Sequence, residues 1–411
     1  MTTLDPQHQS RLQSIKSRIS QSLEMYKEYW RELSIGVYIR IFSLILILII
    51  ASLNPLFPDI NDMNQLITIG LSYMFQGLCP YQRPYLLSAL GANPRDWYIQ
   101  NYMNYGPVNL ILHVPCMLYP WSFDFAGFMD FQPSFMVWHG FFDFLIFDRL
   151  LRMKHRVAAF IIWANPIMVT MDLVTHMSVP IFLLLMGYEK WNDPVKSVFW
   201  LGLGALTYQY IALLLLFVTA YHIRSYKQVL LGILPSLFIL GIFQAWATIE
   251  GRPSALFNDL LLAQFGRSYE PWFPNHIYSW YTWTGSIPAL VFNVYNIVFN
   301  PSLPSSLWVD PVEILTGFRF STLMNGFALG TSIILLAYLV LRPDYKRSLK
   351  FSFISMLLFL LASPSGIWHH NFILLVPVFF MAKEIHILLW RKKKITKTLT
   401  RNQSSQEAQN T

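Results

Sequence analysis

The sequence predicts an all-α protein that crosses a membrane several times. Of its 411 residues, 54% are hydrophobic and only 13% are charged, whereas a soluble domain carries about 25% charged residues. Apolar runs long enough to cross a bilayer, about 17 to 25 residues, recur along the chain. Because backbone polar groups in lipid must find partners within the same segment, these runs predict transmembrane helices.

Residues 1–35 are predicted to form an amphipathic helix on the cytoplasmic surface of the membrane. Their apolar side chains recur at helical spacing, at Leu12, Ile15, Ile19, Leu23, Tyr26, Trp30 and Leu33. Such a stripe beside basic residues is typical of a helix that lies in the interface. The segment does not resemble a signal peptide, because about 35 largely polar residues precede the first apolar run.

The transmembrane domain is predicted to occupy residues 36–390. Several of its expected spans are short for a straight crossing. The spans are 36–54, 134–151, 157–173, 178–190, 197–221, 228–248, 284–300, 321–341, 350–363 and 370–390. Residues 391–411 are basic and then polar, which predicts a disordered cytoplasmic tail.

The net charge of +8 indicates how the chain is oriented. Basic residues gather before the first span and after the last one, and the cytoplasmic flanks of spans are enriched in Lys and Arg. Both termini are therefore expected in the cytoplasm. The chain is expected to be a multi-pass integral protein of the cell membrane, or of the endoplasmic reticulum membrane in a eukaryote. Basic flanks are the norm for such proteins, so the charge does not indicate nucleic-acid binding.

The first outer loop, residues 55–133, is predicted to be large and to carry an interfacial helix. Within it, residues 105–121 either cross the membrane or lie as a re-entrant or interfacial helix on the outer face. The basic group at 149–156 favours the second alternative, because that group then lies in the cytoplasm. This arrangement also places the turn at 172–177 on the outer side.

Two further basic groups, at 222–227 and 342–350, also favour the cytoplasm. To satisfy them, we expect that one of two short segments, 178–190 or 284–300, does not cross fully. The outer side then holds four stretches with polar or charged residues, which are 55–133, 172–177, 249–283 and 364–369. This asymmetry predicts a functional site at the outer interface.

Carboxylates at the start of the outer loop are the first candidates for chemistry. Asp59 and Asp62 follow the first predicted span. A carboxylate at a membrane exit can act as a general base, and the alternative is that both residues cap a helix in solvent.

Asp172 and His176 are four residues apart and share a helix face. Such a pair can bind a metal, orient a phosphate or cap the helix.

Two later outer segments carry further candidates. Arg267 lies in an aromatic-rich loop, where a planar Arg fork can clamp a phosphate and the aromatic residues suit the lipid headgroup belt. His369 and His370 lie at the mouth of a span, where ionisable residues are costly and are candidates for function. Because adjacent helical residues diverge by about 100°, one of the two is expected to face the site.

Cys79 and Cys116 leave two alternatives open, a single disulfide or two free thiols.

Four short motifs, which share a predicted place on the outer face, carry a resemblance to a known family. They are Asp62 with Gly77 and Pro80-Tyr81, Asn104-Tyr105-Gly106-Pro107 with Pro115, Asn165-Pro166 with Asp172 and Thr175-His176, and Ser363-Pro364 with Trp368-His369-His370-Asn371 and Pro377. In this order they resemble motifs of the GT-C superfamily of polytopic glycosyltransferases. The chain is most similar to the branch that uses polyprenyl-phosphate sugars, of the mannosyltransferase type.

This resemblance implies a GT-C-like fold and transfer of a sugar, mannose or a similar hexose, at the extracytoplasmic face. The donor would be a polyprenyl-phosphate sugar and the acceptor a lipid or a glycan. The resemblance implies that Asp62 is the catalytic base and that Arg267, His369 and His370 bind the donor phosphate. The residues expected to bind substrate are Asp172, His176, Tyr81, Arg83 and Tyr105. No Asp-x-Asp pair is present, and a divalent cation stays open as a cofactor.

Two other functions stay open for the same topology. A transporter or flippase of lipid-linked sugars needs ionisable groups near the bilayer midplane and paired broken helices. A non-catalytic assembly subunit would use the outer loops as a docking surface. The charged candidates lie at the ends of the predicted spans, which favours the enzyme over the transporter.

Overall fold

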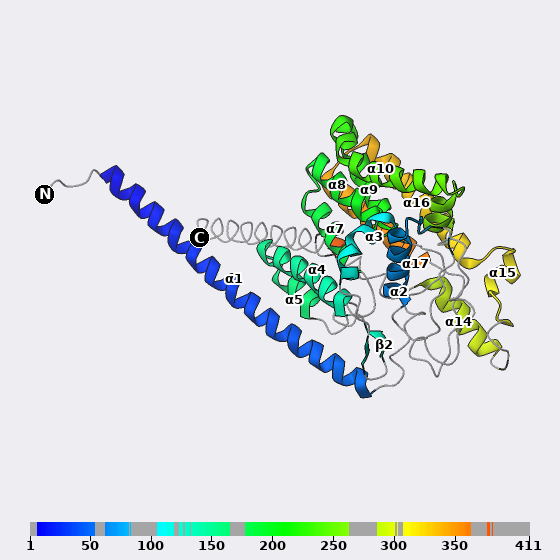
Figure 1. Cartoon of the computed structure of the whole chain (residues 1–411). Helices are drawn as coiled ribbons and strands as arrows, with labels where there is room; N and C mark the ends of the chain where they lie inside the picture. The colour runs from blue at the N-terminus through cyan, green and yellow to red at the C-terminus, as the bar shows by residue number, and fades with distance from the viewer. Residues whose placement is uncertain are drawn as a thin grey trace, which may run out of the picture.

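The predicted helical architecture is confirmed for the part of the chain that the computed structural model describes. This part comprises residues 6–53, 62–81, 83, 105–118, 123–125, 128–131, 133–164, 177–262, 286–300, 302, 307–362, 376–378 and 380. The one addition to the helices is a short antiparallel pair of strands, β1 (Phe123–Phe125) and β2 (Phe128–Phe131). Figure 1 shows the arrangement of the whole chain.

The helices range from short turns to a helix of 48 residues. They are α1 (Pro6–Leu53), α2 (Asp62–Phe75), α3 (Pro107–His113), the 3-10 helix η3 (Val114–Leu118), α4 (Pro133–Arg152), α5 (Arg156–Ala164), α7 (Ser178–Glu189), α8 (Pro194–Ala205), α9 (Ile211–Tyr221), the 3-10 turn η4 (Ile223–Ser225), α10 (Tyr226–Ile249), α11 (Ala255–Phe257), the π-helical turn η5 (Asn258–Leu262), α14 (Ile287–Phe299), α15 (Pro311–Thr316), α16 (Phe320–Leu341) and α17 (Tyr345–Ala362).

Two helices in the described part are long and apolar enough to cross a membrane. They are α10 together with the turn before it, Ile223–Ile249, and α16, Phe320–Leu341. Large apolar side chains on both helices face outward, such as Phe238, which is 70% exposed, and Ile334, also 70% exposed. In water such a surface is unfavourable, and its extent over whole helices is typical of contact with lipid. The larger set of spans expected from the sequence stays a prediction.

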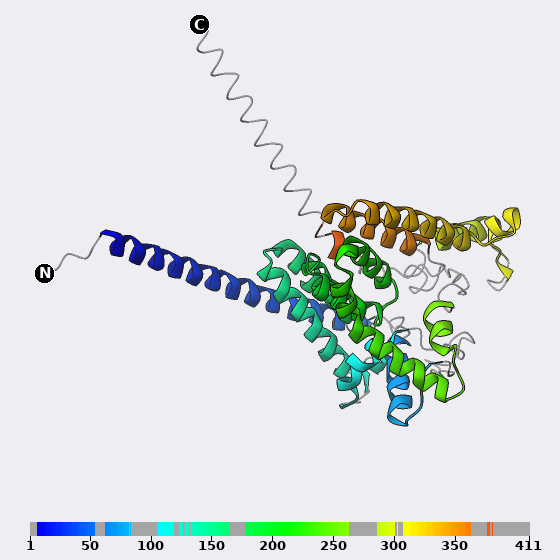
Figure 2. The ribbon, with the colours of Figure 1, turned by 90° about the horizontal axis from the view of Figure 1, so that it is seen from above.

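The first helix, α1, is continuous and joins the predicted surface helix to the first predicted span. At 48 residues it is about 72 Å long. Its N-terminal half extends away from the rest of the molecule, as Figures 1 and 2 show from two directions. Further along, Gly36 lets α1 approach α4, because a Cβ at this position would lie 2.4 Å from the ring of Phe147. The Trp163 indole N–H donates to the Gly36 carbonyl at 2.7 Å.

A bundle made mainly of α4, α5, α7, α8, α9 and α17 surrounds the main hydrophobic core. Its largest fully buried side chains include Tyr188 and Trp191. The polar groups of both rings are satisfied, since the Trp191 indole donates to Ser348 at 2.8 Å and the Tyr188 hydroxyl lies 3.2 Å from Ser352. These bonds fix the start of α17 beside the end of α7.

The prediction of a single helix over 197–221 is wrong, because the chain forms a helical hairpin there. Helices α8 and α9 have 12 and 11 residues and are therefore only about 17 to 18 Å long. At the open end of the hairpin, the His222 Nε2 donates to the Trp191 carbonyl at 2.7 Å. The end of α9 thus returns to the level at which α8 begins.

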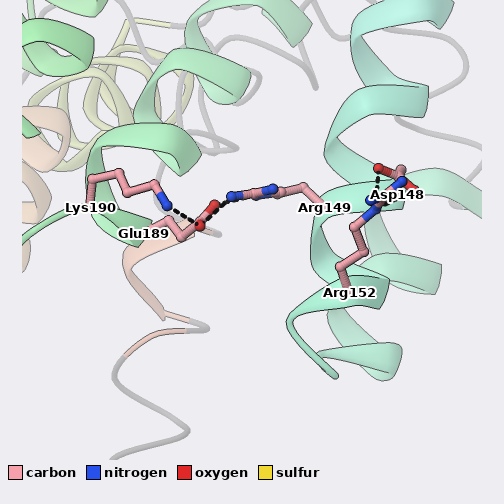
Figure 3. A network of polar contacts seen from close by, with 5 residues as sticks. All are labelled: Asp148, Arg149, Arg152, Glu189 and Lys190. Atoms are coloured by element: carbon pink, nitrogen blue, oxygen red, sulfur yellow. Dashed lines mark hydrogen bonds and ion pairs between the residues drawn. The ribbon is translucent and has the colours of Figure 1, made fainter. Parts of the chain in front are cut away.

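Charged side chains join four helices, α1, α4, α5 and α7, at this same end of the bundle. Figure 3 shows those at α4 and α7. Arg149 of α4 forms an ion pair with Glu189 of α7, which also accepts from Lys190 at 2.9 Å. One turn away, Arg152 pairs with Asp148 at 2.9 Å. Asp148 in addition accepts a hydrogen bond from Tyr29 of α1, and Arg156 pairs with Glu28 and Glu32. The basic group at 149–156 is thus tied to α1 and α7.

Candidate functional site

The candidate site lies in a second hydrophobic core, where α2, α3 and the end of α10 meet. Helices α2 and α10 end in the same way, at a glycine with positive φ, Gly77 (φ 74°) and Gly251 (φ 75°). After Gly77 the Leu78 N–H donates to the Tyr73 carbonyl, and after Gly251 the Arg252 N–H donates to the Ala247 carbonyl. This is the Schellman geometry, for which a left-handed residue is needed. Each glycine turns the chain sharply away from its helix.

Glu250 connects the two helix ends. Its Oε1 accepts from the Cys79 backbone N–H at 2.6 Å, and its Oε2 accepts from the Arg83 guanidinium at 2.5 Å. The same guanidinium donates through Nε to the Cys79 carbonyl at 2.9 Å and lies over the Tyr73 ring, 5.6 Å from its centroid. One carboxylate therefore fixes both the backbone and the cation of the loop that follows α2.

Tyr81 and Tyr105 join this loop to the start of α3. Tyr81 is fully buried, and its hydroxyl donates to the Tyr105 carbonyl at 2.8 Å. Its ring packs edge-on against Phe243 of α10 at 6.0 Å between centroids. Its carbonyl accepts from Arg252 at 3.3 Å. Tyr81 is thus the central side chain around which the loop, α3 and α10 are assembled.

The electrostatics of the cluster favour a rigid frame of paired charges over a proton-transfer site. Burial alone raises the pKa of Glu250, but the bonds from the Cys79 N–H and from Arg83 outweigh it and hold the pKa below its ordinary value of 4.5. Burial also raises the pKa of the Cys79 thiol. Arg252 donates to the Tyr81 carbonyl and Arg83 to the Glu250 carboxylate, so both guanidinium groups hold the loop after α2 in place.

The structure brings together three residues that were expected to bind substrate, Tyr81, Arg83 and Tyr105. Asp62 is the first residue of α2. Because α2 rises 1.5 Å per residue, Asp62 lies about 16 Å along the helix axis from Tyr73, on which Arg83 packs. Asp62 and the Arg83 cluster therefore mark opposite ends of α2.

The remaining predicted site residues lie outside the described residues. They are Asp59, Arg267, His369, His370, Asp172 and His176. Their assignment to phosphate or substrate binding stays a prediction.

Glu250 was missed by the sequence reasoning. The available signal was a single acidic residue between an apolar helix and Gly251, which is easily taken for a solvated helix end.

The structure also explains why position 106 is glycine. A Cβ at Gly106 would lie 2.1 Å from the Leu206 carbonyl oxygen at the tip of the α8–α9 hairpin, and the Val108 N–H donates to the same oxygen at 3.0 Å. The resembling family motif has proline here, but this backbone approach requires glycine.

A second polar arrangement, also missed, lies inside the helices. Asp143 of α4 is fully buried and accepts from Arg40 of α1 at 2.8 Å. Arg40 also donates to the Trp163 carbonyl at 2.7 Å and lies over the Trp163 ring. One turn away on α4, the Nε2 atom of buried His139 lies 3.0 Å from Nε2 of His113. Buried ionisable groups on apolar helices are uncommon and mark sites of possible function.

The described residues offer no disulfide and no cluster of metal ligands. Cys79 and Cys116 are both free and buried, which excludes the disulfide alternative. Among the residues that the structure describes, no group of three or more His, Cys, Asp or Glu side chains is arranged to hold a metal ion.

Comparisons of the chain with protein-family models, with curated proteins and with solved structures find no match. The resemblance to the GT-C superfamily therefore rests on the motifs alone.

Proposed function

We propose that the chain is a multi-pass membrane glycosyltransferase that uses a polyprenyl-phosphate sugar. The observation that carries the proposal is the convergence of two motifs. Tyr81, from the first-loop motif, donates to the carbonyl of Tyr105, from the interfacial-helix motif. Two segments that resemble one family only by their order in the sequence thus form one assembly in space. The apolar exposed surfaces of α10 and α16 support the placement in a membrane.

In the proposed reaction, the acceptor hydroxyl attacks the anomeric carbon of the donor sugar. The bond between that carbon and the phosphate oxygen breaks, and polyprenyl phosphate leaves with the electron pair. Asp62 takes the proton of the attacking hydroxyl. The phosphate is already a good leaving group, so it mainly needs charge stabilisation, which we assign to Arg267 with His369 and His370.

Because α2 is long, we assign different roles to the first-loop residues at its two ends. Arg83 packs on Tyr73, which lies about 16 Å along the axis of α2 from Asp62, and we infer that Arg83 and Asp62 do not share one reacting centre. We therefore assign Arg83, Tyr81 and Tyr105 a positioning role. They clamp the C-terminal end of α2 to α10 and α3, and the rigid helix then fixes Asp62 at its other end.

The test compares Asp62→Asn with Asp59→Asn in purified protein. Each variant is given a labelled polyprenyl-phosphate sugar and an acceptor in detergent. We expect Asp62→Asn to remain folded and to lose transfer, because an amide cannot accept the proton. Asp59→Asn serves as the matched control and should keep most of the activity. Near-normal transfer by Asp62→Asn would exclude Asp62 as the base.

A second candidate, a transporter of lipid-linked sugars, is favoured by the buried pair of Arg40 and Asp143. Asp143 lies about 14 Å along α4 from Arg152, which is close to half of the roughly 30 Å hydrocarbon thickness. The half-length helices α8 and α9 are the second feature expected of transporters. Sealed vesicles separate the functions, because a transporter moves label across the bilayer without an acceptor and an enzyme does not.

A further inference from the structure

The segment between α14 and α16 presents large apolar side chains to the outside. Leu315 is 84% exposed, Ile314 62%, Phe318 60% and Leu307 58%. Residues 307–319, which include α15, are called the α15 segment below. A single exposed leucine needs no explanation, but several neighbouring ones mark a binding surface.

Hydrogen bonds hold the α15 segment in the conformation that exposes these side chains. The buried Asp310 carboxylate accepts from the Val312 N–H at 2.9 Å and, through its other oxygen, from the Phe320 N–H at 2.9 Å. It thereby caps the N-termini of both α15 and α16. The Asn296 amide of α14 pairs with both backbone groups of Val309, at 2.7 and 3.1 Å.

The two sides of α15 differ in polarity. At about 100° per residue, Ile314 and Leu315 lie on one side of the helix, and Glu313 and Thr316 lie on the other. Glu313 is 3.8 Å from Arg319, and the Thr316 hydroxyl donates to the Val312 carbonyl at 2.7 Å. A helical turn with one apolar and one polar side is typical of an element in the plane of a membrane interface.

The α15 segment leads directly into α16, which also carries exposed apolar side chains. Along α16, Leu323, Phe327 and Ile334 are 42%, 61% and 70% exposed. Figures 1 and 2 show α15 at the edge of the molecule, past the beginning of α16. A lipid layer that surrounds α16 offers one continuous apolar contact to both.

We propose that the α15 segment is a membrane anchor whose apolar side chains enter the lipid leaflet at the N-terminal end of α16. Leu315 and Ile314 reach the upper acyl region, and Glu313 faces the aqueous side. The inference rests on the membrane placement in the proposed function. A soluble protein partner is the alternative occupant, and the test distinguishes the two.

The test measures depth with single spin-labelled cysteines in proteoliposomes of phosphatidylcholine and phosphatidylglycerol. The variants are Leu315→Cys, Glu313→Cys as the matched control on the opposite side of α15, and Ile334→Cys as a reference within α16. The native thiols, Cys79 and Cys116, are 0% and 2% exposed, so the unmodified protein supplies the labelling background. Power-saturation measurements compare collisions with oxygen, which partitions into lipid, and with a water-soluble nickel chelate.

We expect oxygen to dominate at Leu315 and Ile334 and the nickel chelate to dominate at Glu313, with at least a tenfold difference in the accessibility ratio between Leu315 and Glu313. Oxygen-dominated Ile334 with nickel-dominated Leu315 would overturn the anchor and leave the membrane placement intact. Shielding of Leu315 from both reagents would also overturn it, because a protein then covers the site. A nickel-dominated Ile334 would contradict the membrane placement itself.

Discussion

Glu250, which the sequence did not single out, joins the end of α10 to the loop that follows α2. Its two oxygens hold the Cys79 backbone and the Arg83 guanidinium at 2.6 and 2.5 Å. Both partners are largely shielded, with Glu250 16% and Arg83 19% exposed. In such surroundings the loss of one partner leaves the other charge poorly solvated. Glu250 should therefore matter for stability and for the geometry of the loop after α2.

We predict that Glu250→Gln destabilises the folded protein by about 2 to 3 kcal/mol. The amide keeps the shape of the side chain but removes the charge that Arg83 and the Cys79 N–H share. The measurement is the thermal unfolding midpoint in detergent. Transfer activity should fall as well, because the end of α2 is no longer clamped.

The matched control is Glu313→Gln, which also removes a carboxylate beside an arginine. That pair is 3.8 Å apart and exposed, and exposed pairs contribute about 0 to 1 kcal/mol. Equal midpoints for Glu250→Gln and Glu313→Gln would contradict the role assigned to Glu250.

The pH dependence of stability follows from the lowered pKa of Glu250. A carboxylate whose folded pKa is depressed contributes stability at pH values above its unfolded pKa, and that contribution is lost as pH falls through the folded pKa. We expect the stability difference between the native protein and Glu250→Gln to be constant from pH 7 to about 5 and to shrink below 4.5. Unfolding midpoints measured across this range test it. A difference that persists unchanged at pH 3.5 would argue against an ionised Glu250.

At the scale of single residues, the sequence singled out Tyr81, Arg83 and Tyr105. The structure bonds Tyr81 to Tyr105 and places Arg83 in the same loop, against Glu250. Their partners were not foreseeable, because Glu250 is far from them in the chain and carries no motif. Sequence spacing shows which side chains share a helix face, but a contact between distant segments depends on how the helix ends turn. Here Gly77 and Gly251, which have positive φ, turn the chain at the ends of α2 and α10 and so bring these segments together.

At the scale of elements, α3 and the tip of the α8–α9 hairpin approach each other closely through their backbones. The Leu206 carbonyl accepts from Val108 N–H and lies where a Cβ of residue 106 would be. The polar tip of the hairpin thereby gains a partner away from water. Glycine at position 106 is thus a requirement of packing.

We predict that Gly106→Ala destabilises the protein by at least about 3 kcal/mol, because backbone atoms on both sides must move apart. The matched control is Gly140→Ala on α4, where an added Cβ meets nothing within 4 Å. Alanine there should be neutral or stabilising by up to about 1 kcal/mol, since it favours helix. Unfolding midpoints of the two variants provide the measurement. A Gly106→Ala protein as stable as Gly140→Ala would show that the approach is not close.

The break between α8 and α9 could not be predicted from hydrophobicity. Both helices are apolar, and a run of 25 residues over 197–221 has the length of a span. The only signal is the polar stretch Thr207-Tyr208-Gln209-Tyr210 in its middle. Such a stretch also fits a polar face within a continuous helix. What distinguishes the alternatives is a tertiary contact, the bond from Val108 to Leu206.

At the scale of the whole molecule, the hairpin brings the basic groups of the chain to one end. Arg149 contacts Glu189, His222 contacts Trp191, and Trp191 contacts Ser348. These contacts place the groups at 149–156, 222–227 and 342–350 at a common level. Because α8 and α9 return to their starting level, α7 is free to cross. The expectation from the sequence that 178–190 or 284–300 does not cross fully stays a prediction.

The resulting topology gives the last prediction. With the basic groups in the cytoplasm, α10, which has 24 residues and a length of about 36 Å, carries the chain to the outer side at Glu250. We therefore expect Gln228→Cys and Arg347→Cys to react with a membrane-impermeant maleimide only after cells are permeabilised. Ser254→Cys and Thr316→Cys should react in intact cells.

Buried Cys79 and Cys116 keep the background of this labelling low. The four positions are exposed on the protein surface, so their reactivity reports the side of the membrane and not burial. If 197–221 crossed as one span, Gln228 and Lys190 would lie on opposite sides, and the outer loop would then follow α14 instead of α10. Labelling of Gln228→Cys in intact cells would establish that arrangement, and it would place the Glu250–Arg83 clamp in the cytoplasm, away from any polyprenyl-linked donor on the outer face.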